Sequence, residues 1–325
     1  MTPTPMLRCA EYVSFIAAHP LQTVRTRDGH EWRLFDVGPG SSTWAGAAPP
    51  PREGGGGSAA CGSAAATAAG AALPLVCVHG SSGTAHAFFM QCRGLAAQGH
   101  RCISVGWAAA FSHDEWCRSL SLLLDALGLR QVHMYGASLG GFLAQAFARV
   151  YPQRVRSLAL TNSLCDTSAF HDAAGLFDGA YAYLPDFVLR GMVLDSFPPE
   201  EARDSLSAGE ADAIDFQIAQ LETLTQRELA ARVTLNVTVG LSPFLRRRGA
   251  LPGLPDERIT FIDALDQHNI AREQREQLYA AHPDAKQALL RSGGDFPFLS
   301  RFDEVTLHLV VHLRRNSRAE GEEES

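Results

Sequence analysis

The chain contains 325 residues and carries a formal net charge of −7. This acidic balance provides no basic surface for phosphate groups, so nucleic acid is excluded as a partner. The length suits one large α/β domain, and residues 1–325 are predicted to form a single one.

The cysteine usage and the N-terminal sequence predict a cytoplasmic protein. Seven cysteines are scattered along the chain without a C-x-x-C pair, which indicates reduced thiols and neither disulfides nor a metal site. Residues 1–20 lack a basic segment followed by an apolar run, so no secretory signal is expected. Residues 59–78 are uncharged but rich in Ala, Gly and Ser, and are too weakly apolar to span a membrane. No cofactor is predicted.

The first predicted elements form a hairpin. Residues 22–27 and 31–37 alternate around Asp28-Gly29, a strong signal for two antiparallel strands joined by a tight turn. From residue 38 to 73 the sequence consists mainly of Pro, Gly, Ser and Ala. Such a composition cannot bury enough apolar surface to offset its ordering entropy, so 38–73 is predicted to be a flexible insertion.

Repeated β-α-β units follow the insertion. Residues 75–78 form a short apolar run typical of a buried parallel strand, and a helical pattern over 85–98 ends at Gly99. Further elements are predicted in the same alternation: strands over 101–106, 132–137 and 155–161, and helices over 113–127 and after Ser138. This alternation predicts a doubly wound, mostly parallel sheet.

Ser138 lies in Gly136-Ala137-Ser138-Leu139-Gly140, between a predicted strand and a predicted helix. Glycines at the flanking positions permit a strained strand-to-helix turn, because Cβ atoms there would collide. This nucleophile elbow lifts the serine hydroxyl to a helix N-terminus, where N–H groups stabilise an oxyanion. The predicted oxyanion donors are the N–H of Leu139 and that of Ser81, in the glycine-bearing loop after the first parallel strand. His79 in that loop is interpreted as a loop-fixing residue.

The alternation of strands and helices breaks after the elbow unit. Residues 163–249 have helical and loop patterns, and an all-helical stretch at this place is typical of a lid. The remaining predicted elements are strands over 258–263 and 286–290, helices over 271–281 and 300–315, and a charged, disordered tail over 316–325.

The sequence supplies only two of the three groups of a hydrolase triad. In α/β-hydrolases the acid follows the strand before last and the histidine follows the last strand. Ser138 takes the nucleophile position and Asp266 the acid position, with Asp263 as the alternative acid. The base position holds Asp295, and its loop contains no histidine. A triad that lacks its base retains only weak residual activity, so the sequence favours a non-catalytic protein over an enzyme.

Other histidines are poor substitutes for the missing base. His268 lies in the acid loop, and the last predicted helix carries His308 and His312, so each needs an unusual backbone path to reach Ser138. His282 completes the set of nearby candidates.

Longer segments resemble the maspardin family of α/β-hydrolase-like proteins: 136–145, 161–167, 211–216, 228–236 and 293–297. The resemblance covers about residues 12–315 and implies an α/β-hydrolase fold without the triad histidine. It also implies a cytosolic protein that associates peripherally with endosomal and trans-Golgi membranes and acts by binding protein partners, which the sequence does not identify. The insertion over 38–73 and the sequence His79-Gly80 depart from the animal members. The alternative function is a serine esterase or lipase that uses Ser138 with an unorthodox base.

Overall fold

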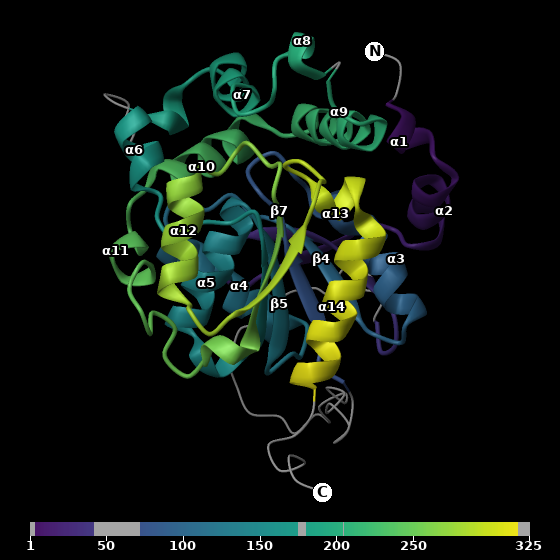
Figure 1. Ribbon diagram of the computed structural model, residues 1–325, viewed down its shortest axis with the longest axis vertical. Coiled ribbons are helices and arrows are strands. Elements are labelled where there is room, and N and C mark those ends of the chain that lie inside the picture. The colour runs from purple at the N-terminus through teal and green to yellow at the C-terminus, as the bar shows by residue number, and fades with distance from the viewer. Residues whose placement is uncertain (1–3, 42–71, 175–179, 204, 318–325) are drawn as a thin grey trace, which may run out of the picture.

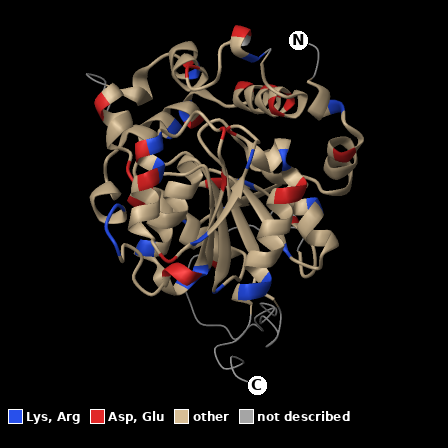
Figure 2. Cartoon of the chain, in the orientation of Figure 1, with Lys and Arg blue, Asp and Glu red and all other residues tan. Residues whose placement is uncertain are grey.

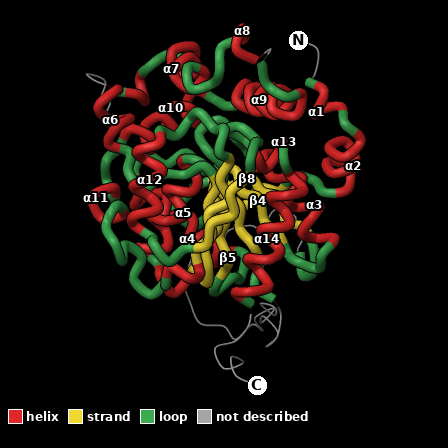
Figure 3. Tube along the Cα trace, in the orientation of Figure 1, coloured by secondary structure: helices red, strands yellow, loops and turns green. Residues whose placement is uncertain are grey.

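The computed structural model describes residues 4–41, 72–174, 180–203 and 205–317. Figure 1 shows a central sheet with helices on both faces and a further group of helices across one end. Figure 3 shows the strands enclosed by these helices, and Figure 2 shows acidic and basic residues interspersed on the outer elements. Residues 42–71 of the predicted insertion and 318–325 of the predicted tail lie outside the described residues. In the described ranges, no helix combines the length and apolar character needed to cross a membrane.

In the part of the chain that the structure describes, the sheet has eight strands in the order β1-β2-β4-β3-β5-β6-β7-β8. Strand β2 pairs antiparallel with β1 and β4, and every other pairing is parallel. The predicted doubly wound, mostly parallel sheet is confirmed. Its strands are β1 (Gln22–Arg25), β2 (Glu31–Val37), β3 (Leu75–Val78), β4 (Cys102–Gly106), β5 (Val132–Ala137), β6 (Val155–Thr161), β7 (Ile259–Ala264) and β8 (Lys286–Leu290).

Two hydrophobic cores lie on opposite faces of the sheet. Helices α4 (His113–Ala126), α5 (Leu139–Val150) and α12 (Arg272–Ala281) contribute to one core, and α3 (Phe89–Ala97) and α14 (Phe302–Asn316) to the other. Strands β3, β4, β5 and β7 are buried at every residue, which explains why their sequences are nearly continuous apolar runs.

Among the described residues between β6 and β7, six α-helices fall within the region predicted as a lid. They are α6 (Ser168–Ala174), α7 (Asp186–Leu194), α8 (Glu200–Arg203), α9 (Ala208–Glu222), α10 (Gln226–Val237) and α11 (Ser242–Leu245). The two longest of these helices, α9 and α10, begin with capping boxes. Ser207 and Glu210 form the box of α9, and Thr225 and Glu228 form that of α10. In Figure 1, α7, α8 and α9 extend across the top of the molecule, over the end of the sheet at which β5 meets α5.

The structure differs from the predicted elements at three places. Two helices that no pattern predicted, α1 (Pro5–Arg8) and α2 (Ala10–Ala18), precede β1. The helix predicted over 300–315 corresponds to α14, and an additional short helix, α13 (Pro297–Ser300), precedes it. Arg301, with φ −129 and ψ 38, separates the two. The helix predicted over 85–98 begins as the 3₁₀ turn η1 (Ala85–Phe88) before α3.

Candidate functional site

Ser138 occupies a strained turn between β5 and α5. Its φ of 51 and ψ of −126 lie in a region that costs a non-glycine residue free energy. A Cβ on Gly136 would stand 2.5 Å from the Gly141 Cα, and one on Gly140 would stand 2.2 Å from the Val78 carbonyl oxygen. The backbone of the elbow therefore packs too closely for side chains at either flanking glycine.

Two hydrogen bonds hold the elbow in place. The Ser138 N–H donates to the Thr161 carbonyl at 3.0 Å, and the Ser163 hydroxyl donates to the Ser138 carbonyl at 3.0 Å. Leu139 is the first residue of α5, so its N–H has no acceptor within the helix. This is the geometry that an oxyanion donor needs.

The loop that carries Ser81 is held by Arg232 of α10. The Arg232 side chain is 3% exposed, and its Nη1 donates to the Ser81 carbonyl at 2.8 Å and also to the Gly83 carbonyl. Burial lowers the pKa of Arg232 to about 9. The sequence analysis missed this role because Arg232 lies 151 residues from Ser81, in a helix whose pattern indicates only lid packing.

His79, in the same loop, is packed as a fixed side chain. Its ring stacks on Trp107 with centroids 4.9 Å apart and planes 7° apart, and its Nδ1 lies 2.7 Å from the Gly80 carbonyl. Burial, and then the nearby Arg232, hold the pKa of His79 well below its usual range. The neutral ring therefore donates from Nδ1 to the loop backbone.

Asp266, at the predicted acid position, lies two residues after β7 and is partly buried. Its carboxylate accepts hydrogen bonds from the N–H groups of Gly293 and Gly294, at 3.2 and 3.0 Å. Both donors belong to the loop after β8. The carboxylate of Asp266 therefore ties the acid loop to the loop that carries the base position.

Asp295, at the predicted base position, makes the reverse connection. Its Oδ1 accepts from the N–H groups of His268 and Asn269, at 2.7 and 2.8 Å, in the loop that carries Asp266. Burial raises the pKa of Asp295, and the two backbone N–H bonds oppose that rise. The two carboxylates thus hold the two loops together reciprocally.

Asn162, at the end of β6, links the same region to the sheet. It adopts a φ of 43, and its Oδ1 accepts from the Ala264 N–H at 3.0 Å while its Nδ2 donates to the Gly294 carbonyl at 3.0 Å. Its own N–H donates at 2.6 Å to Asp263, the alternative acid, which also accepts from the Tyr279 hydroxyl. Asp263 is 1% exposed and serves this strand-end network. The segment 161–167 contributes to the family resemblance, but no local sequence pattern predicts this structural role of Asn162.

A cavity of 370 Å³ opens at Ser138 between the sheet and the lid helices. Ser81, Asn162 and Asp295 lie in its wall with Ser138, whereas Asp266 is not among the lining residues that the structure describes. Apolar side chains form much of the remainder, including Phe170, Met192, Val193, Val233, Ile270 and Phe296. The structure therefore brings the predicted nucleophile and base positions to one cavity, and the predicted acid is not among the described residues that line it.

In the described part of the chain, none of the four histidines considered as a replacement base lines this cavity: His268, His282, His308 and His312. His282 is buried and bonds to Asp256 at 2.9 Å. His312 is buried between the hydroxyls of Ser157 and Thr260, at 2.7 and 2.8 Å. Burial lowers the pKa of His312 to about 3. Both rings belong to the core.

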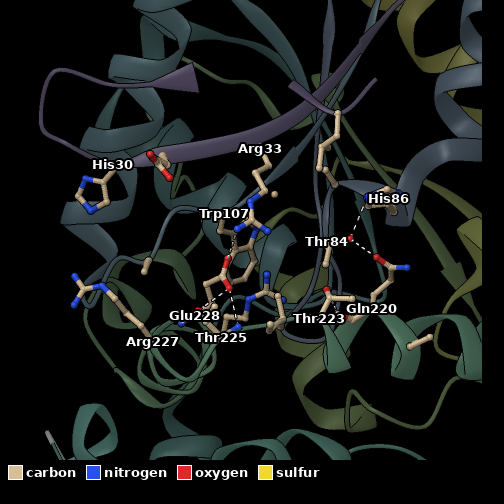
Figure 4. Close-up of a pocket in the computed structure, with 18 of the residues that line it drawn as sticks. His30, Arg33, Thr84, His86, Trp107, Gln220, Thr223, Thr225, Arg227 and Glu228 are labelled. Atoms are coloured by element: carbon tan, nitrogen blue, oxygen red, sulfur yellow. Dashed lines mark hydrogen bonds and ion pairs between the residues drawn. The ribbon is translucent and has the colours of Figure 1, made fainter. Parts of the chain in front are cut away.

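A second, larger cavity of 910 Å³ lies between the β1–β2 hairpin and helices α9 and α10 (Figure 4). The Thr84 hydroxyl donates to the Gln220 Oε1 at 2.7 Å, and Glu228 accepts from the Thr225 N–H at 2.8 Å. These two hydrogen bonds join residues within the cavity wall, and Ser138 is not among the described lining residues. Over the described ranges, no group of three His, Cys, Asp or Glu side chains could hold a metal ion.

Comparison with known proteins places these features in a family. A family model of the α/β hydrolase fold matches residues 74–205. Maspardin of Danio rerio is 38% identical over 244 residues and human maspardin 39% identical over 243 residues, in both cases covering 74% of this chain and 74% of the relative. A thermophilic esterase from Thermogutta terrifontis has a TM-score of 0.67 at 17% identity, covering 92% of this chain and 99% of the esterase, and therefore shares the fold. The chain belongs to the maspardin family of proteins with the α/β-hydrolase fold.

Proposed function

We propose that this protein is a non-catalytic binding protein, an adaptor that associates peripherally with endosomal or trans-Golgi membranes. The observation that carries the proposal is the cavity at Ser138, in which Asp295 takes the base position and no histidine lies among the described lining residues. A serine hydroxyl is a weak nucleophile until a neighbouring base removes its proton. Membership of the maspardin family supports the same interpretation.

Asp295 is a poor replacement for the base. Its Oδ1 already accepts two backbone N–H bonds, and the ordinary pKa of an aspartate lies about 2.5 units below that of histidine. When ionised, its charge also opposes the oxyanion that attack by Ser138 would create. The carboxylate supports the loops but would not activate the serine.

Two aromatic side chains in the lid region supply a surface for a protein partner. Tyr183, in the 3₁₀ turn η4 (Tyr181–Tyr183), is 89% exposed, and Phe187, in the first turn of α7, is 75% exposed. Exposed aromatic residues are costly in water and are enriched at protein interfaces. We assign these two residues to the binding surface of the adaptor.

The catalytic question is tested by reacting the purified chain with a fluorophosphonate probe and with p-nitrophenyl acetate. We expect no Ser138 labelling within minutes and the same slow turnover in the parent chain and in Ser138→Ala. An Asp295→His variant provides a gain-of-function control, because it would complete the order Ser138, Asp266, His. Its turnover should rise at least about tenfold, which is roughly 1.4 kcal/mol of barrier, and adding Ser138→Ala should abolish the gain.

A serine esterase is the second candidate function, and the strained elbow at Ser138 is the observation that favours it. Rapid, saturating labelling of Ser138 together with ester turnover that is lost in Ser138→Ala would establish the esterase and overturn the adaptor proposal. If Asp295→His folds but stays inactive, the cavity lacks more than a histidine, which agrees with a binding role.

The adaptor role is tested by capturing partners with variant chains. Tyr183→Ser combined with Phe187→Ser should reduce recovery of partners and of membrane vesicles, because it removes the exposed aromatic surface. Ser138→Ala should leave recovery unchanged. Leu307→Ser is the matched control, since Leu307 is also apolar and 60% exposed but lies in α14. Equal loss in the Leu307→Ser variant would show a general effect of surface polarity.

A further inference from the structure

One buried cation in the wall of the second cavity has spare hydrogen-bond donors. Arg232 uses its Nη1 for the Ser81 and Gly83 carbonyls, but its Nε and Nη2 have no acceptor among the described residues. Neither of these two nitrogens is fully covered by protein atoms. Arg232 also forms no ion pair with a described carboxylate, which is unusual for a buried charge. Because Arg232 lines this cavity, the two nitrogens are left to donate to its contents.

Two further guanidinium groups line the same cavity, those of Arg33 on β2 and Arg227 on α10. The Arg33 Nη2 is 3.9 Å from the Glu228 Oε1, which is too far for a hydrogen bond. Arg227 lies 5.2 Å from the centre of the Phe111 ring and forms no ion pair with a described residue. Burial, and in addition the charge of Arg33, lower the pKa of Arg232, whereas Glu228 raises it. An anion close to Arg33 and Arg232 would relieve the repulsion between them.

The carboxylates of this cavity are already paired within the protein. Those among the described lining residues are Asp28, Glu31, Glu115 and Glu228. The His30 ring lies between Asp28 and Glu115, with its nitrogens 3.1 and 3.2 Å from their oxygens. Glu31 accepts from Arg25, and Glu228 accepts from the N–H and the hydroxyl of Thr225, both at 2.8 Å. The unused hydrogen-bonding groups of the charged side chains are therefore guanidinium donors, which favour a ligand with acceptor oxygens.

The cavity has room for more than an isolated ion. Its 910 Å³ lie near the upper end of the range of about 300–1,000 Å³ found for ligand sites. Thr84, His86, Gln220 and Thr223 lie together on one side of Arg33 and Glu228 in Figure 4. Burial lowers the pKa of His86 to about 4, so this side is uncharged at pH 7. It suits an uncharged polar part of a ligand.

The acidic residues of the wall limit the charge of that ligand. A phosphate monoester carries about two negative charges at pH 7, and a carboxylate carries one. Since carboxylates share the cavity with the guanidinium groups, the second charge of a phosphate would add repulsion. A single carboxylate, whose two oxygens match the planar fork of an arginine, is therefore favoured.

We propose that the second cavity binds a carboxylate group carried on an uncharged polar body. Arg33 and Arg232 donate to the carboxylate oxygens, and Arg227 adds positive charge to the same cavity. A small organic acid and the C-terminal end of a peptide both present this chemistry. Ser138 is not among the described residues that line the cavity, so the proposal is independent of the function assigned to the Ser138 cavity.

The test compares acids with amides of the same shape on the full chain. One pair is acetyl-trialanine and its C-terminal amide, and the other is glycolate and glycolamide. Dissociation constants are measured by ligand-observed NMR titration at low ionic strength. We expect the acid to bind at least about tenfold more tightly than the amide, because hydrogen bonds to charged groups are the stronger ones. The pair that shows this preference identifies the source of the carboxylate.

Two variants change the site in opposite directions. Arg33→Gln, at an exposed position, should remove most of the preference for the acid. Glu228→Gln should raise the affinity for the acid several-fold and leave that for the amide unchanged, because it removes a competing negative charge. Gln also fits the third position of a capping box, so α10 keeps its N-terminus. Arg247→Gln is the matched control, because it makes the same charge change at an exposed arginine that is not among the described lining residues.

Four results would overturn the proposal. They are equal affinity for acid and amide in both pairs, no binding of any probe, an unchanged preference in Arg33→Gln, and tighter binding of methyl phosphate than of glycolate. Labelling of Ser138 by a fluorophosphonate reports on the other cavity. A failure of the carboxylate site and a failure of the adaptor proposal are therefore distinguishable.

Discussion

Asp295→Ala tests whether the base position has a structural role. The change removes the acceptor of two N–H groups, those of His268 at 2.7 Å and Asn269 at 2.8 Å. Hydrogen bonds to a charged group contribute about 1.5–3 kcal/mol each, and the lower end applies because the carboxyl is only partly buried. The free energy of unfolding should therefore fall by about 3 kcal/mol.

Asp295→Asn separates the hydrogen bonds from the charge. The Asn carboxamide oxygen can still accept from both N–H groups, but both bonds weaken because the acceptor is neutral. At the same time, the burial penalty of the ionised carboxylate disappears. These effects oppose each other, so the unfolding free energy should change by about 1 kcal/mol or less.

Urea unfolding followed by tryptophan fluorescence measures both variants, and a midpoint shift at constant slope gives the stability change. Asp284→Ala, at an exposed aspartate, is the matched control and should have little effect. An Asp295→Ala protein as stable as the parent, or more stable, would refute the reasoning. That result is typical of a residue kept for chemistry at the expense of stability.

Three further predictions concern the neighbouring groups. Burial raises the pKa of Asp295 above 3.8, so the folded state holds the carboxyl proton more tightly than the unfolded chain does. The contribution of Asp295 to stability therefore falls as the pH rises from 3.8 through the higher pKa of the folded state. Urea titrations should show the parent losing stability relative to Asp295→Asn as the pH rises above about 3.8, and a constant difference would contradict the shift. Arg232→Met leaves the Ser81 and Gly83 carbonyls without their donor, so it should cost about 2 kcal/mol and reduce hydrogen-exchange protection across residues 79–84. Asn162→Gly keeps the positive φ but removes the side-chain bonds, and a loss below about 0.5 kcal/mol in urea unfolding would show that they contribute little.

The sheet could be predicted because its signals are local. The apolar runs at Leu75–Val78 and Val155–Thr161 coincide with β3 and β6, and the Asp28-Gly29 turn joins β1 to β2. Each pattern reflects burial on both faces or a turn geometry that neighbouring residues determine. The short helix α1 has four residues and no buried side chain, so it left no periodic pattern to detect.

The candidate site could be predicted only in part. The positions of Ser138, Asp266 and Asp295 follow from their order relative to strands, and the oxyanion roles of Leu139 and Ser81 stay predictions. The reciprocal bonds between the two carboxylate loops were not foreseen, because a carboxylate near a loop in sequence does not show which N–H groups face it in space.

The elbow and the base position carry different information. Gly140 packs against the Val78 carbonyl and Gly136 against Gly141, so the crossing of β5 and α5 requires both glycines whatever Ser138 does. The positive φ of Ser138 belongs to the same crossing and therefore indicates the fold rather than the reaction. We propose that residue 295 decides the chemistry, because its side chain can either take a proton from Ser138 or accept from the N–H groups of the acid loop. In the structure the Asp295 Oδ1 accepts both of those bonds, and the proposal of a non-catalytic protein rests on that arrangement.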